Sequence, residues 1–179
     1  MTRNPSHGQG HAVKAPNPTA WITSAPGNVT PPESSEDLLR RSITEVLRLI
    51  REDLAMDMVL ITIYVGDTVV ISHAAAACEE ANIIGVSCAS ESSICERVLE
   101  GRLPAVIPDM AALKRTHDVQ VTPIIPAAFM AVPIVLSCGT RYGVLCCLNS
   151  TPMLELEQRQ HRRLQMSAQH IARLVDDAG

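Results

Sequence analysis

At both ends of the folded part of the sequence, apolar residues recur every three or four positions. This spacing is typical of an amphipathic helix that buries one face. The first set consists of Leu39, Ile43, Val46, Leu47, Ile50 and Leu54. The second set follows residue 155 and consists of Leu156, Leu164, Ala168, Ile171, Leu174 and Val175. Ser34 stands before the first set with acidic residues behind it, and therefore predicts that a helix begins there.

Between these two helices the apolar residues form short runs separated by turn residues, which predicts strands. Residues 58–64 (MVLITIY) and 68–74 (TVVISHA) flank a Gly-Asp turn and predict one hairpin. Residues 128–136 and 142–149 flank a Cys-Gly-Thr turn and predict a second hairpin. Pro133 lies inside the first strand of that pair, so we expect an edge, a bulge or an unpaired amide there.

The middle of the sequence is less regular. Residues 83–86 predict a short strand, and Ser90 is expected to cap a short helix that carries Ile94 and Val98. The two prolines within 104–110 indicate an extended segment, because proline disfavours helix in the residue before it. A loop with one helical turn is expected to follow, up to residue 126.

This order of elements predicts an α+β fold with an antiparallel sheet of five to six strands. The N- and C-terminal helices are expected on one face of the sheet, and the short helix with the loops on the other. Residues 1–33 hold six of the twelve prolines and show no apolar period, so they predict a flexible tail. Residues 34–179 are then one domain.

Composition narrows the classes of function. The chain has 179 residues, of which 46% are hydrophobic and 19% charged, as in ordinary globular proteins. Its net charge of −4 and its aromatic content of 2% argue against nucleic acid as a partner. No apolar run is long enough for a membrane helix, and the N-terminus resembles no secretory signal. We therefore expect a cytoplasmic protein with no membrane partner.

Several short sequence motifs in the chain resemble those of a known family. They are Met56-Asp57-Met58, residues 93–98 (SICERV), residues 100–104 (EGRLP), Ile107-Pro108-Asp109, residues 131–134 (AVPI) and residues 142–147 (YGVLCC). Their order and spacing resemble the GAF domain family of small-molecule sensor modules over about residues 36–176. The resemblance is to the bacterial subgroup often joined to cyclic-di-GMP enzymes or histidine kinases.

The resemblance implies a ligand cavity between one face of the sheet and the overlying loops. The ligand-binding candidates that it implies are Ser93, Ile94, Cys95, Arg97, Asp109, Phe129 and Val132. An alternative remains open, in which this region packs as core, Arg97 pairs with Asp109, and Asp109 caps a helical turn. The chain lacks the Asn-Lys-x-Asp-Glu string of cyclic-nucleotide-binding members and the Cys-His pair of bilin-binding members. The cofactor stays unknown, with His73 or His117 as a remote candidate for a haem ligand.

The six cysteines form no Cys-x-x-Cys pair, so zinc-ribbon and thioredoxin-like sites are not expected, and no metal site is predicted. Cys146 and Cys147 are neighbours on a predicted strand, so their side chains should face opposite sides of the sheet. Core packing is the favoured role for both. Cys88 and Cys95 remain candidates for a thiol pair with Arg97 nearby.

The resulting expectation is a non-enzymatic sensory domain that binds a small molecule and relays the event to a partner. Apolar residues outside the sheet-facing stripe, such as Leu38, Leu49 and Met166, favour a homodimer through the terminal helices. A downstream signalling enzyme is the other expected partner. Two alternatives stay open. One is a thiol-based methionine sulfoxide reductase or redox sensor, and the other is a protein-interaction module with a vestigial cavity.

Overall fold

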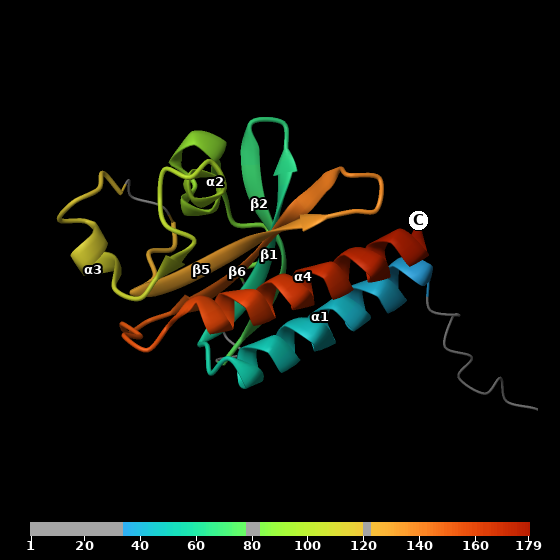
Figure 1. The fold of residues 1–179 in the computed structure, drawn as a ribbon. Helices are drawn as coiled ribbons and strands as arrows, with labels where there is room; N and C mark the ends of the chain where they lie inside the picture. Colours follow the sequence, from blue (N-terminus) through green and yellow to red (C-terminus); the bar gives the residue numbers. More distant parts are fainter. Residues whose placement is uncertain (1–33, 78–82, 120–122) are drawn as a thin grey trace, which may run out of the picture. The chain divides into compact units, whose positions relative to one another are not determined.

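The computed structural model describes residues 34–77, 83–119 and 123–179, and the flexible tail predicted at residues 1–33 lies outside them. Figure 1 shows the course of the chain. The elements in chain order are α1 (Ser35–Asp53), β1 (Met58–Val65), β2 (Thr68–Ala76), β3 (Ser87–Ala89), η2 (Ser90–Ser92), α2 (Ile94–Leu99), β4 (Val106–Ile107), α3 (Met110–Leu113), β5 (Ala128–Val135), β6 (Arg141–Asn149) and α4 (Gln158–Ala178).

The strands form one six-stranded sheet in the order β3-β2-β1-β6-β5-β4. Every neighbouring pair is antiparallel. The two predicted hairpins, β1–β2 and β5–β6, are both formed, and β1 joins them by pairing with β6. The predicted α+β fold with an antiparallel sheet is thus confirmed.

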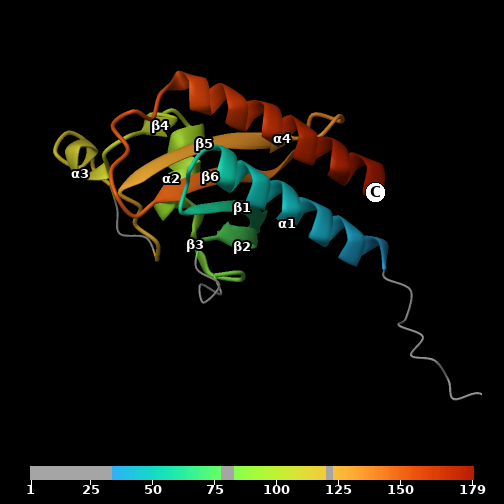
Figure 2. The ribbon, with the colours of Figure 1, turned by 90° about the horizontal axis from the view of Figure 1, so that it is seen from below.

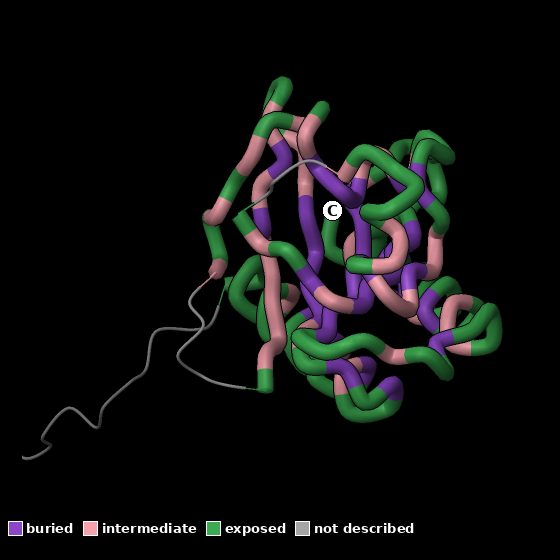
Figure 3. The backbone as a smooth tube through the Cα atoms, turned by 90° about the vertical axis from the view of Figure 1, so that its left-hand side faces the viewer, coloured by how far each residue is buried: buried purple, intermediate pink, exposed green. Residues whose placement is uncertain are grey.

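Two layers cover this sheet. Helices α1 and α4 lie side by side on one face, while α2 and the loops around it lie on the other (Figures 1 and 2). Each face has its own hydrophobic core. Leu47 and Leu164 are fully buried in the core beneath the long helices, and Ile94 and Phe129 belong to the core beneath α2. The buried residues gather along the middle of the sheet, where β6 is buried over residues 143–149 and β1 over residues 59–62 (Figure 3).

Both long helices begin at polar caps. The Ser34 hydroxyl accepts a hydrogen bond from the Asp37 N–H at 3.1 Å, as the sequence predicted. At α4, the backbone N–H of Glu157 donates to the Gln160 side chain at 3.1 Å, which is one half of a capping box. These contacts satisfy backbone groups that the first turn of a helix leaves unpaired.

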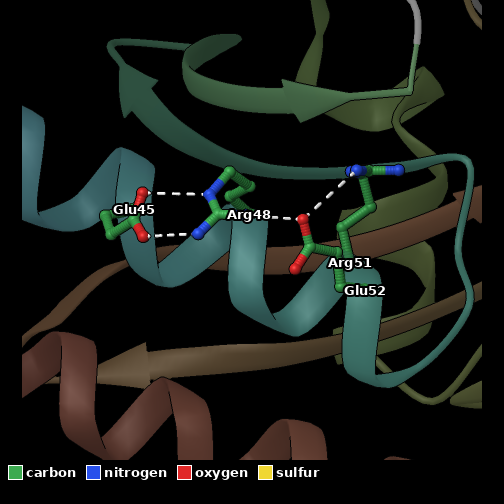
Figure 4. A network of polar contacts seen from close by, with 4 residues as sticks. All are labelled: Glu45, Arg48, Arg51 and Glu52. Carbon is green, nitrogen blue, oxygen red and sulfur yellow. Dashed lines mark hydrogen bonds and ion pairs between the residues drawn. The ribbon is translucent and has the colours of Figure 1, made fainter.

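The solvent-facing side of α1 carries a chain of ion pairs (Figure 4). Arg48 donates to Glu45 at 2.7 Å and to Glu52 at 2.6 Å, and Arg51 lies 3.8 Å from Glu52. The two carboxylates raise the pKa of Arg48 above its ordinary value. Exposed pairs of this kind contribute little to stability, so the attachment of α1 to the sheet rests on its buried face.

The middle of the chain departs from two expectations. Residues 83–86 form a turn, and the strand that pairs with β2 is β3, a few residues later. Gly85 explains the difference, because its φ of +88° breaks an extended run while its N–H still donates to the Ile71 carbonyl at 2.8 Å. Ser90 does not cap α2 but begins the 3₁₀ turn η2, and Ser93 occupies the N-cap position of α2.

Pro133 lies in β5, which has β6 on one side and β4 on the other. The β4 strand is only two residues long and pairs with Phe129 and Met130. The N–H of Ala131 points to the β4 side, where it donates to the Ala105 carbonyl at 3.3 Å. Backbone amides alternate along a strand, so Pro133 faces the same side beyond the end of β4, where no ladder bond is lost.

Among the residues that the structure describes, no helix combines the length and the apolar character that a membrane crossing requires.

Candidate functional site

A small cavity lies between the sheet and the α2 layer. Its volume is about 70 Å³. All six of the elements β1, β2, β3, β5, β6 and α2 contribute to the lining, together with the segments before β3, α2 and β5. The lining residues are Leu60, Thr62, Val69, Ile71, Val86, Ser87, Cys88, Ser93, Ile94, Cys95, Pro123, Ile124, Pro126, Phe129, Cys146 and Leu148. None of these lining residues carries a formal charge at neutral pH. The cavity is therefore an apolar chamber with a few hydroxyl and thiol groups in its wall.

The structure brings four of the seven sequence-predicted site residues to this cavity: Ser93, Ile94, Cys95 and Phe129. Ser93 and Cys95 are buried, with 3% and 8% of their surface exposed. They are held there because α2 lays its first turn against the sheet. Its buried residues are Ile94, Cys95 and Val98, and they include Ile94 and Val98, which the sequence had assigned to this helix.

Val132 does not line the cavity. Side chains of a strand alternate between the two faces of its sheet, and Phe129 points into the α2 layer. Val132 is three residues further along β5, so it faces α1 and α4 and is buried in their core instead. The same alternation places Met130 on the helix side and Ala131 on the cavity side.

Asp109 and Arg97 are not part of the cavity wall either. Asp109 accepts a hydrogen bond from the Ala112 N–H at 3.0 Å and is the N-cap of α3, which is the structural role left open from the sequence. Two nitrogens of Arg97, Nε and Nη1, are buried without a hydrogen-bond partner among the described residues. Of the two, Asp109 is thus explained by local structure alone.

Cys95 and Cys146 are in direct contact in the wall of the chamber. Their Sγ atoms are 3.1 Å apart, one on α2 and the other on β6. A hydrogen bond from Cys146, supported by Ser93, lowers the pKa of Cys95 below the usual thiol value. Burial and the neighbouring Cys95 raise the pKa of Cys146. Cys95 is therefore the member of the pair that ionises more readily.

Thr62 is a site residue that sequence reasoning missed. Its side chain is buried in the cavity wall, and its hydroxyl makes no hydrogen bond of good geometry within the described residues. It lies close enough to Cys95 to contribute to the lowered pKa of that thiol. A buried hydroxyl with spare hydrogen-bonding capacity is a group to which a ligand would naturally bind.

Cys88 also lines the chamber, but it is not joined to Cys95 by a hydrogen bond in the described part of the chain. Burial, and next the neighbouring Cys95, raise the pKa of Cys88. The sulfur in contact with Cys95 is that of Cys146, while Cys88 lines the same chamber. The sequence did anticipate that one of two adjacent cysteines would face the cavity, and this residue is Cys146, while Cys147 packs beneath the long helices.

A polar cluster connects α2 to the end of β1 and the start of β6. Glu96 of α2 accepts a hydrogen bond from the Tyr64 hydroxyl and lies 3.5 Å from Arg141. The Arg141 guanidinium is 4.4 Å from the centre of the Tyr64 ring. Burial, and then the bond to Glu96, raise the pKa of Tyr64. These contacts hold the cavity-lining helix in place from its solvent side.

The described residues contain no group of three or more histidine, cysteine or acidic side chains that would hold a metal ion. His73 and His117, the remote candidates for haem ligation, are not among the lining residues. His73 lies on β2 with its Nδ1 atom 3.0 Å from the Ser72 hydroxyl, and His117 is exposed beside α3.

The comparisons with known proteins agree with this fold. The family model described as "GAF domain" matches residues 39–175. The GAF domain of an Acinetobacter phosphoenolpyruvate-protein phosphotransferase has a TM-score of 0.62 at 15% identity, covering 78% of this chain and 83% of its own. A fragment of a methyl-accepting chemotaxis protein, residues 122 to 287, has a TM-score of 0.63 at 15% identity, with 78% and 90% covered.

A third similar structure is an enzyme, the type II free methionine-R-sulfoxide reductase from Thermoplasma acidophilum. Its TM-score is 0.62 at 10% identity, covering 80% of this chain and 96% of the reductase. At such low identities the likeness concerns the fold alone. No curated protein matches the sequence.

Proposed function

This chain belongs to the GAF domain family, and we propose that it is a sensory domain that binds a small, neutral, largely apolar molecule in the chamber beside α2. The observation that carries this proposal is the chamber itself. Small-molecule sites are mostly apolar pockets with a few polar groups that fix orientation. Here the apolar wall comes from both sheet and helix, and Thr62 and Ser93 offer hydroxyl groups.

The size of the chamber limits the ligand class. One water molecule needs about 10–15 Å³ on this measure, so about 70 Å³ holds a ligand of only a few non-hydrogen atoms. Tetrapyrroles and cyclic dinucleotides are far larger, and the uncharged wall offers phosphate groups no partner. A haem, a bilin or a cyclic nucleotide therefore does not fit the chamber in this conformation.

The proposed relay runs through the sheet to α1 and α4. Strands β5 and β6 are shared by the two cores, because alternate residues face the chamber and the long helices. A ligand that moves Cys146 or Phe129 must therefore also disturb the packing of Cys147 or Met130. The ligand shifts the helix arrangement only to the extent that it binds one arrangement better than the other.

The proposed partners are a second copy of the chain and a downstream signalling enzyme, in the cytoplasm. Leu38 and Leu49 on α1 and Met166 on α4 are 49%, 51% and 70% exposed. These apolar side chains lie on the outside of the helix layer, which is the surface that a homodimer through the terminal helices would cover.

A thiol-based reductase is a second candidate, favoured by the three thiols of Cys88, Cys95 and Cys146 around one cavity. The reductase from Thermoplasma acidophilum shares the fold. If the chain were such an enzyme, free methionine sulfoxide would be reduced at the expense of a dithiol. If the protein does not reduce free methionine sulfoxide, the sensory proposal is favoured over the reductase.

The sensory proposal is tested by native mass spectrometry of freshly purified protein, beside xenon binding followed by the xenon chemical shift. We expect either an added mass that is lost on denaturation or saturable xenon binding, since apolar cavities take up xenon. Val69→Phe fills the chamber and should abolish both signals. Val70→Phe, one residue along β2 and outside the lining, is the matched control.

If Val69→Phe retains the added mass, the ligand binds elsewhere. If wild-type protein shows neither signal, the chamber is vestigial and the interaction-module alternative is preferred.

A further inference from the structure

We propose that Cys95 and Cys146 are a reversible disulfide site, at which a small peroxide oxidises the two thiols and a dithiol reductant restores them. This site is a chemical activity of the domain in addition to the proposed ligand binding, and it does not depend on that binding. It requires only that two thiols meet and that an oxidant reaches them.

The first argument is the contact between the sulfurs. At 3.1 Å, the Sγ atoms of Cys95 and Cys146 are closer than two non-bonded sulfurs usually lie, and they need to approach by only about 1 Å more to reach the length of an S–S bond. The backbone at Cys146 is fixed, because β6 pairs there with Leu60 on one side and Ala131 on the other. The two sulfurs therefore approach mainly by movement of Cys95, which lies on the short helix α2.

The second argument is access. Both residues are buried, yet both line the chamber. A peroxide of two or three non-hydrogen atoms fits into about 70 Å³. The wall also carries no charged group that would bind an anionic oxidant. A small neutral oxidant can therefore reach both sulfurs through the chamber.

The third argument is the asymmetry of the pair. Only a thiolate attacks a peroxide efficiently, and the hydrogen bond from Cys146 stabilises the thiolate of Cys95. Ser93 and Thr62 support the same charge. Cys146 retains its proton until it is needed, because burial and the neighbouring sulfur raise its pKa. Cys95 is thus the attacking thiol, and Cys146 is the resolving thiol.

The chemistry balances in two steps. The Cys95 thiolate attacks one oxygen of the peroxide, the O–O bond breaks, a sulfenic acid forms on Cys95, and the leaving alkoxide or hydroxide takes up a proton. Cys146 then attacks the sulfenic sulfur, the S–S bond forms, the S–O bond breaks, and water leaves with the Cys146 proton. The two thiols lose two electrons and the peroxide gains them. Exchange with a dithiol reverses the change.

The other described cysteines serve as internal controls. Cys147 adjoins Cys146 in sequence but faces the opposite core. Cys88 lines the same chamber without a hydrogen bond to either sulfur in the described residues. Cys138 is exposed in the turn between β5 and β6. If the disulfide joins only Cys95 and Cys146, it must form in preference to any disulfide with Cys147, Cys88 or Cys138.

The test is oxidation of the full reduced chain with hydrogen peroxide, followed by alkylation of the remaining thiols and mass spectrometry. Digestion with trypsin and a glutamate-specific protease isolates residues 92–96, whose only cysteine is Cys95. Before alkylation, we expect an intact mass lower by two hydrogen atoms and recovery of the original mass with dithiothreitol. After alkylation and digestion, we expect a cross-link from this peptide to the one that contains Cys146. Cys147→Ala should keep the cross-link, and Cys146→Ala should lose it.

Mapping in wild-type protein decides the question even if a variant folds poorly. A cross-link from Cys95 to Cys88, or a disulfide through Cys138 between two chains as the sole product, would overturn the proposal. So would full alkylation of Cys95 and Cys146 under conditions in which Cys138 is already oxidised.

Discussion

Cys146 and Cys147 are adjacent in strand β6, yet their side chains lie in two different hydrophobic cores. Cys146 faces the chamber beside α2, and Cys147 faces the long helices. The core beneath α2 and the core beneath the long helices are thus separated by a single layer of backbone, and a shift of Cys146 in one core also moves its sequence neighbour in the other.

The first prediction concerns the order in which the thiols react with iodoacetamide in native protein. Cys138 is exposed, and hydrogen bonds from Thr140 lower its pKa, so it should react first. Cys147 is buried, and burial raises its pKa, so it should react last. The measurement is peptide mass spectrometry over time. Labelling of Cys147 before Cys138 would contradict the assignment of these residues.

The second prediction is that Gly143→Ala strongly destabilises the domain. A Cβ atom at Gly143 would overlap the backbone carbonyl oxygen of Thr62 on the adjacent strand β1. Relief requires the β1–β6 pairing to shift, so we expect a loss of about 3 kcal/mol in the free energy of unfolding. Urea denaturation measures it. Ser137→Ala in the exposed β5–β6 turn is the control, and should change stability by less than about 0.5 kcal/mol.

A cost below about 1 kcal/mol for Gly143→Ala would show that the two strands separate more readily than their packing indicates.

The third prediction is a dependence of stability on pH from His73. Burial, and next the nearby Arg40, lower the pKa of His73 from its ordinary value of 6.5. The folded protein therefore prefers the neutral ring, and the unfolded chain takes up the proton first as the pH falls. This contribution to stability is present above pH 6.5 and is lost as the pH falls through the lowered pKa.

Urea unfolding between pH 8 and pH 5 should show this loss in wild-type protein and less of it in His73→Gln. His170→Gln, on the exposed side of α4, is the control. An unchanged pH dependence in His73→Gln would assign the effect to other groups.

The fourth prediction follows from the proposed disulfide. Cys95 and Cys146 are 51 residues apart in sequence, and a cross-link over that separation restricts the unfolded chain. Loop-closure entropy sets the gain at roughly 4 kcal/mol at most. Oxidised wild-type protein should resist urea better than reduced protein, and Cys146→Ala should show no difference between the two conditions. Equal stability of both wild-type forms would mean that native-state strain offsets the gain.

The fifth prediction concerns the proposed homodimer. Leu49→Glu and Met166→Glu place a charge on the exposed apolar positions of the two long helices. If these helices pair between two copies, both substitutions should raise the dissociation constant at least about tenfold, which corresponds to 1.4 kcal/mol. Sedimentation analysis measures it. Leu154→Glu, exposed but outside both helices, is the matched control.

Much of the fold could be predicted from the sequence, because apolar periods, helix caps and turn residues are local signals. The apolar period and the Ser34 cap locate α1, which runs from Ser35 to Asp53. The turn residues locate both hairpins. The prediction of a strand at 83–86 was wrong, because Gly85 turns the chain and the paired strand begins only at Ser87. Apolar content alone does not carry that information.

The lining of the chamber was harder to predict from the sequence, because it joins residues that are distant along the chain. Helix α2 was identified as one wall, but Val69, Ile71 and Thr62 from the first hairpin were not. Phe129 and Val132 were both proposed, although an odd spacing of three places them on opposite faces of a strand. The contact between Cys95 and Cys146 depends on the packing of a helix against a central strand, which no local pattern encodes.

Helices α1 and α4 run antiparallel, so α1 begins beside the end of α4 (Figures 1 and 2). The connectivity of the domain can consequently be rewired without moving any of its strands. A short linker from Gly179 to Ser34, with new ends opened in the β5–β6 turn, gives a circular permutant that keeps every strand pairing and the chamber, although β5 and β6 are no longer joined by a turn. In that permutant the helix pair becomes an internal hairpin, and its register is set by the linker.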